Sequence, residues 1–98
     1  MKLSHSEIIE LLTAIGFKKI IEEKDIYYKD YSAHNDYVIR VNFKNEKIEY
    51  GLRISLGDLT TSNFENSENF VVLECVDRAL TKGYEPENIS LEHKWPMG

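Results

Sequence analysis

Hydrophobic positions near the N-terminus follow the period of a helix. Four apolar residues recur at the spacing that places one stripe on a buried face, namely Ile8, Leu11, Leu12 and Ile15. Ser4, with Glu7 three residues later, has the spacing of a capping box. Gly16 follows as the residue that can take the left-handed conformation at a helix end. The pattern predicts a helix over residues 4–15.

Between residues 17 and 54 the period changes to two, which is typical of half-buried strands. The clearest alternating apolar positions are Tyr37, Ile39, Val41 and Phe43, followed by Ile48, Tyr50, Leu52 and Ile54. Residues 17–22 and 26–31 are weaker strand candidates. Short polar connections at 32–35 and 44–46 have hairpin lengths. Three or four antiparallel strands in a meander are therefore expected.

The last third of the chain predicts a loop, a helix and an extended segment. Residues 57–67 are rich in Thr, Ser and Asn and match neither period, whereas residues 70–82 regain the helical one. Gly83 is placed to end this second helix, and residues 89–95 look extended. We expect an α+β fold of order α-β-β-β-β-α plus the C-terminal segment. Both helices should cover one face of the antiparallel sheet, because its apolar face must be buried.

Length and charge limit the classes of protein. The chain has 98 residues and a formal net charge of −5, so one domain with one core is expected. No apolar run approaches the roughly 20 residues of a membrane span. Glu7 and Glu10 interrupt the apolar stretch that a signal peptide needs, which favours the cytoplasm. The acidic balance argues against general binding to a phosphate backbone but allows a local basic face.

Strand alternation also predicts which side chains reach solvent. If the apolar set of residues 37–43 points inward, Arg40 points outward, and the same reasoning exposes Arg53, Tyr27, Lys29 and Tyr31. Aromatic rings beside cations on an open sheet can stack bases and hold phosphates. The ordinary alternative is that Tyr is a good strand former whose hydroxyl tolerates water.

Metal-binding and catalytic patterns are weak in this sequence. Asp30, His34 and Asp36 lie near one turn without a recognised ligand spacing, so a solvated turn is expected. Cys75, the single cysteine, is expected to be a small buried hydrophobic residue. Glu92 and Lys94 have the spacing of half a metal-dependent nuclease site, but its acidic partner upstream is not identifiable. We assign no catalytic, cofactor-binding or metal-binding residue.

From Gly57 onward, the predicted helix, a Lys82-Gly83-Tyr84 turn and an Ile89-x-Leu91-Glu92-x-x-Trp95 stretch follow one another. In their order and spacing, these segments resemble the N-terminal regions of bacterial restriction-modification proteins, chiefly type I-like N6-adenine DNA methyltransferases. The Asn/Asp-Pro-Pro-Tyr/Phe motif and the Gly-rich cofactor loop of these methyltransferases are both absent. The resemblance therefore implies a non-catalytic N-terminal module, spanning residues 1–98, of a longer protein.

These observations lead to three hypotheses. The first is an accessory domain that assists assembly with downstream domains or other subunits of a restriction-modification complex, with weak DNA contact. Its candidate interaction residues are Tyr27, Tyr31, Arg40, Arg53, Tyr84 and Trp95. The second is a nucleic-acid-binding module that uses the Tyr/Arg sheet face. The third is a minimal nuclease that depends on Glu92.

Overall fold

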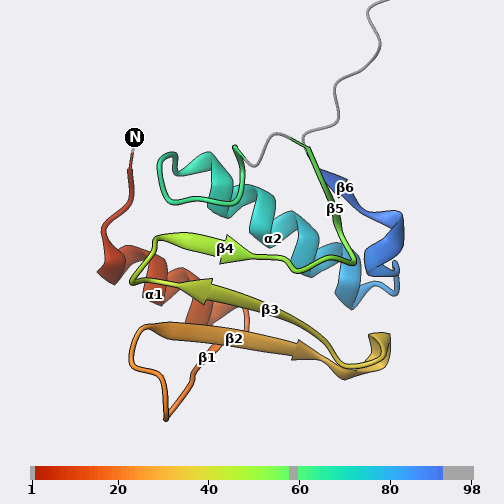
Figure 1. Cartoon of the computed structure of the whole chain (residues 1–98), viewed down its shortest axis with the longest axis horizontal. Helices are drawn as coiled ribbons and strands as arrows, with labels where there is room; N and C mark the ends of the chain where they lie inside the picture. Colours follow the sequence, from red (N-terminus) through yellow and green to blue (C-terminus); the bar gives the residue numbers. More distant parts are fainter. Residues whose placement is uncertain (1, 58–59, 92–98) are drawn as a thin grey trace, which may run out of the picture.

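The sheet of this protein is a four-stranded antiparallel meander whose strands follow one another in chain order, β1-β2-β3-β4. The structure is a computed structural model in which residues 2–57 and 60–91 are described. The elements in chain order are α1 (His5–Ala14), β1 (Lys18–Lys19), β2 (Ile26–Tyr31), η1 (Ser32–His34), β3 (Tyr37–Asn42), β4 (Lys47–Glu49), β5 (Ser55–Leu56), α2 (Glu68–Thr81), η2 (Pro86–Asn88) and β6 (Ser90–Leu91). β5 and β6 form a separate parallel pair (Figure 1). The predicted α+β fold is confirmed.

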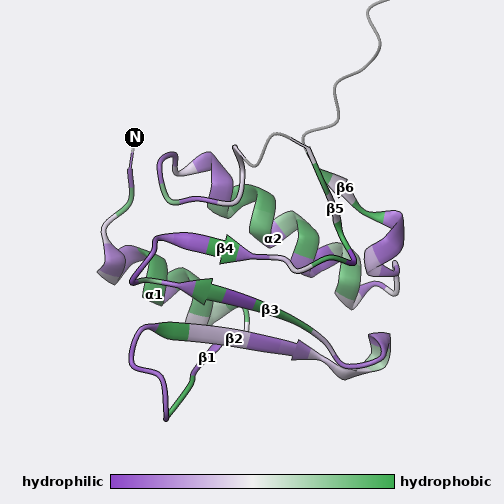
Figure 2. Cartoon of the chain, viewed as in Figure 1, coloured by the Kyte–Doolittle hydropathy of each residue, from purple (hydrophilic) through white to green (hydrophobic). Residues whose placement is uncertain are grey.

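Both helices lie on the same side of the meander, as the sequence predicted. Lys29 on β2 reaches both of them, because its Nζ donates to the carbonyl of Ile15 at the end of α1 and to Asp77 of α2. One hydrophobic core fills the space between sheet and helices, and hydrophobic positions follow the inner sides of α1 and α2 (Figure 2). Its fully buried members include Ile8, Leu12, Ile39, Val41, Phe70 and Leu73.

Local sequence signals set the ends of the helices. The capping box of α1 forms as predicted, with the Ser4 hydroxyl accepting from the Glu7 amide and the Glu7 carboxylate accepting from the Ser4 amide. α2 begins two residues earlier than predicted, where the side chain of Asn66 accepts from the Glu68 amide. Gly83 follows α2 with a φ of 106°. Within the described ranges, neither helix has the length and apolarity needed to cross a bilayer.

The predicted strand over residues 48–54 was too long. β4 ends at Glu49, and Gly51 then takes a φ of 75°, which turns the chain out of the sheet. Leu52 consequently stands fully exposed, whereas Ile54 is buried beyond the turn. The expected first strand over 17–22 is likewise reduced to Lys18–Lys19.

The two edges of the sheet differ. At one edge, β1 consists of two exposed lysines. At the other, the segment around Ser62 lies against β4, because the Ile48 amide donates to the Ser62 carbonyl at 2.7 Å and Lys47 forms a β-bridge with Asn63. Within the described part of the chain, neither edge therefore presents a long run of unpaired backbone groups.

Candidate functional site

The outer face of the sheet carries a row of polar and aromatic side chains. Lys18, Tyr28, Arg40 and Glu49 are successive cross-strand neighbours from β1 to β4. The first three line a hollow of about 520 Å³, together with residues of the β1–β2 turn. Arg40 is exposed on this outer face, where alternation placed it.

The prediction that Tyr27 and Tyr31 point outward was wrong. Tyr31 is buried on the side of the helices, and the ring of Tyr27 lies 5.4 Å from that of Phe43 in the core. The β2 residues that face outward are Ile26, Tyr28 and Asp30, one position out of phase with the expected set. Tyr28, and not either of the two predicted tyrosines, is the cross-strand neighbour of Arg40.

A half-buried carboxylate explains the phase of β2. Asp77 Oδ1 on α2 accepts from Lys29 Nζ at 2.6 Å and from the Tyr31 hydroxyl at 2.6 Å. Lys29 Nζ also donates to the Ile15 carbonyl at 2.7 Å. A cation in this position satisfies one of the carbonyls that have no partner within the helix at its C-terminal end. Burial, followed by the hydrogen bond to Asp77, raises the pKa of Tyr31. The cluster joins β2 to both helices, and a structural role accounts for all three of its side chains.

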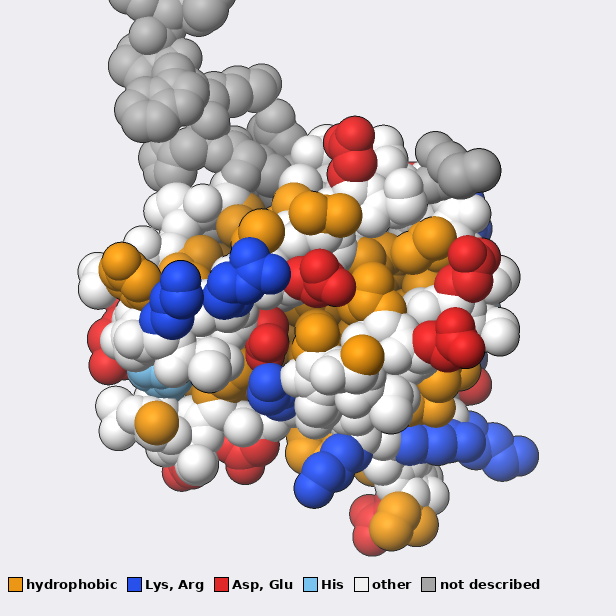
Figure 3. Space-filling view, turned by 180° about the vertical axis from the view of Figure 1, so that it is seen from behind, with side chains coloured by type: hydrophobic (Ala, Val, Ile, Leu, Met, Phe, Trp, Pro, Cys, Tyr) orange, Lys and Arg blue, Asp and Glu red, His pale blue; other side chains and the backbone are white. Residues whose placement is uncertain are grey.

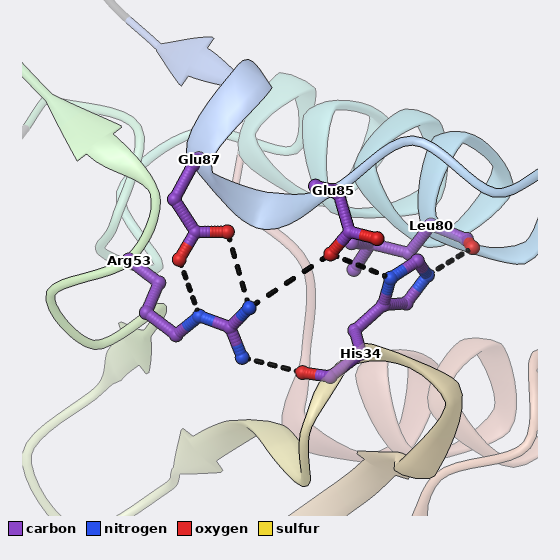
Figure 4. Close-up of polar contacts among 5 residues, drawn as sticks. All are labelled: His34, Arg53, Leu80, Glu85 and Glu87. Carbon is purple, nitrogen blue, oxygen red and sulfur yellow. Dashed lines mark hydrogen bonds and ion pairs between the residues drawn. The ribbon is translucent and has the colours of Figure 1, made fainter.

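Arg53 does not lie on the open sheet face either. It follows the turn after β4 and holds together two short helical turns, η1 and η2 (Figure 4). Its guanidinium bonds both carboxylate oxygens of Glu87, at 2.6 and 3.1 Å, and donates to the carbonyl of His34. It also lies 5.5 Å from the ring centre of Tyr37. These contacts use the guanidinium within the fold, so Arg53 is a poor candidate for binding a ligand.

His34 is buried, contrary to the solvated turn predicted around it. Only 5% of the residue is exposed, and its Nε2 lies 2.8 Å from the Leu80 carbonyl. Its Nδ1 lies 3.2 Å from the carboxylate of Glu85, as Figure 4 shows. The Leu80 carbonyl, with help from Glu85, raises the pKa of His34 above its ordinary value. Asp30 and Asp36 are exposed, and the described residues include no group of His, Cys, Asp and Glu that could hold a metal.

Two further predicted positions have different outcomes. Tyr84 is 60% exposed just after α2, where a partner could contact it. Trp95 lies outside the described residues, and so do Glu92 and Lys94 of the possible nuclease motif.

The second surface hollow is an apolar groove along α2. Its volume is about 240 Å³, and its lining is Val71, Val72, Cys75, Val76, Ala79, Ile89 and Leu91. Cys75 is exposed there, so the prediction of a buried cysteine was wrong. Val71 is 57% exposed. Hydrophobic side chains gather in this hollowed face, with acidic and basic groups around them (Figure 3).

Sequence reasoning missed the groove and the Asp77 cluster for related reasons. α2 has apolar residues around more than half of its circumference, so periodicity alone could not say which of them the core covers. A signal for the cluster did exist. Asp77 sits between the core residues Val76 and Leu80, where a carboxylate requires a cationic or hydroxyl partner.

Comparison with models of protein families, with curated proteins and with solved structures found no match.

Proposed function

We propose that this chain is a non-catalytic interaction domain of a DNA restriction-modification enzyme, which assists the assembly of its domains or subunits in the cytoplasm. The apolar groove along α2 and β6 is the observation that carries the proposal. Exposed apolar area bounded by charged groups is typical of protein interaction surfaces. The resemblance of the chain from Gly57 onward supplies the restriction-modification setting.

The groove fits a protein contact better than a small-molecule site. It is shallow and lined almost wholly by aliphatic side chains of α2, β6 and the preceding Ile89. Small-molecule sites, in contrast, include a few polar groups that fix the orientation of the ligand. Val71 stands at the exposed side of the groove, and its substitution can weaken a contact without disturbing the core.

Coding sequence around this gene provides the first test. We expect a methylase motif with a Gly-rich cofactor loop, either downstream in the same reading frame or in a neighbouring gene. The protein is then produced together with that methylase, and the size of the complex is measured. Val71→Asp should reduce the size of the complex, whereas Leu52→Asp, at a fully exposed position outside the groove, should leave its size unchanged. A coding region without any methylase or nuclease motif would contradict the restriction-modification setting.

A second candidate function is the binding of single-stranded nucleic acid on the outer sheet face. The specific observation is that Tyr28 lies between Lys18 and Arg40 in the cross-strand row. The ring can stack a base while the two cations contact phosphates. Glu49 at the end of the row and the net charge of −5 oppose the binding of long polyanions. A short single strand is therefore the expected ligand.

Titration with labelled single- and double-stranded DNA at two salt concentrations tests this candidate. Binding should weaken with salt, and Arg40→Gln should lower the slope of log affinity against log salt by about 0.7 if Arg40 neutralises one phosphate. Tyr28→Ala should weaken binding about tenfold through lost stacking. Lys44→Gln, at an exposed turn position, is the control. Absence of binding at tens of micromolar protein in low salt would exclude this function.

A further inference from the structure

We propose that the partner seated on the groove is a second copy of this chain, with α2 packed antiparallel against the α2 of that copy around a two-fold axis at Cys75. The inference rests on the proposed function, because it names the contact through which the domain assembles.

An exposed stripe with the spacing of a coiled-coil seam runs the length of α2. Its members alternate at steps of three and four residues and are all exposed, namely Glu68, Val71, Cys75, Arg78 and Lys82. This is the spacing at which one helix meets another. The inner side of α2 is already buried in the core by Phe70, Leu73, Val76 and Leu80. The stripe is therefore a second helix-packing face, separate from the first.

The face of α2 that includes the stripe and the neighbouring groove residues Val72 and Ala79 is complementary to itself when it is reversed around Cys75. In an antiparallel pair, residues equally far before and after the axis face one another. Val71 and Ala79 are each four residues from Cys75, so a larger apolar side chain meets a small one. Glu68 and Lys82 are each seven residues away, so opposite charges meet at both ends of the contact. A two-fold contact uses the same patch on both copies, and this patch satisfies that condition.

The surroundings of the stripe fit the same contact. Ile89 and Leu91 line the groove beside α2 and extend the apolar area that a second copy would cover. Arg78 would face Val72 of the other copy, where its aliphatic part can lie on apolar surface while the guanidinium stays in water. The sheet offers no comparable route, because one edge carries two exposed lysines and the other is paired with the segment around Ser62.

Charge reversal provides the sharpest experiment. The dimer dissociation constant is measured by analytical ultracentrifugation for the 98-residue chain and its variants. Glu68→Lys and Lys82→Glu should each weaken the dimer about tenfold, because each turns two attractive pairs into repulsive ones. The double variant should return to within about threefold of the unchanged protein. Leu52→Asp is the control for an exposed apolar position outside the stripe.

Cys75 gives an independent readout. Mild oxidation should link two copies through Cys75 within the dimer, and Val71→Asp should abolish both the link and the dimer. The inference is overturned if the protein is a monomer at every accessible concentration. It is also overturned if the double charge-reversal variant forms a weaker dimer than either single variant. A third result also overturns the inference: a monomer in which Cys75 does not react with a thiol reagent but becomes reactive after Trp95→Ala. The C-terminal segment would then be the occupant of the groove. A monomer that still binds the methylase overturns only the homodimer, whereas a dimer without methylase binding overturns only the proposed function.

Discussion

The Asp77 carboxylate is the polar link between β2 and the two helices, and removing it should be costly. Asp77→Ala leaves both Lys29 Nζ and the Tyr31 hydroxyl without the acceptor that each contacts at 2.6 Å. The side chains of Lys29 and Asp77 are 24% and 13% exposed, so water can replace the lost bonds only in part. Hydrogen bonds to charged groups contribute about 1.5–3 kcal/mol each.

Two such bonds, discounted for this partial access of water, predict a loss of about 3 kcal/mol in the free energy of unfolding. Small domains have about 5–15 kcal/mol in total, so the variant should remain folded while its melting temperature falls by about 15 °C. Urea denaturation followed by circular dichroism gives the free energy. Asp30→Ala is the matched control, because Asp30 is an exposed carboxylate on the outward side of β2, the strand that carries Lys29 and Tyr31.

A double-mutant cycle tests the reasoning directly. Lys29→Met combined with Asp77→Ala should cost at least about 1 kcal/mol less than the sum of the two single losses, because the pair is lost only once. Additivity within about 0.3–0.5 kcal/mol would mean that the two side chains do not interact. The assigned phase of β2 would then be wrong.

Three further predictions concern η1, the turn after β4 and the end of α2. His34→Gln should destabilise the protein most below about pH 6.5 and progressively less as the pH rises through the raised pKa of His34, because that pKa lies above its unfolded value; urea midpoints that differ by a constant amount from pH 5.5 to 9 would refute this. Arg53→Lys should lower the urea midpoint, since lysine cannot bond two oxygens of Glu87 and a carbonyl in one plane, whereas Arg40→Lys should not. Gly83→Ala should cost about 1 kcal/mol because of its φ of 106°, and a cost below about 0.5 kcal/mol, measured by the same denaturation, would contradict this expectation.

Local signals in the sequence were sufficient for the elements that local interactions determine. The capping box at Ser4 and the helical spacing that follows it specify α1 within its own residues. The meander follows from short connections, which allow only antiparallel neighbours. Elements of this kind need no information from distant parts of the chain.

The errors arose where distant residues decide the outcome. The two faces of β2 each carry a mixture of apolar and charged side chains, so alternation alone does not say which face is buried. Asp77, which is 48 residues from Lys29, decides that Lys29 and Tyr31 point toward the helices. The candidate site moved for the same reason, because Tyr31 followed Lys29 inward and left Tyr28 beside Arg40. Cys75 was predicted to be buried because α2 is apolar around most of its circumference. Only the packing of the sheet against α2 shows which apolar residues are covered.

The two protected edges of the sheet have a consequence for aggregation of the chain during its synthesis. A strand edge with unpaired backbone groups can recruit another unfolded chain and start a fibril. Here the short β1 edge carries the charges of Lys18 and Lys19, and the β4 edge becomes paired only after the segment around Ser62 has been made. A nascent chain that stops before residue 62 should therefore be far more prone to aggregate than one extended through that segment, and light scattering of the two purified fragments would measure the difference.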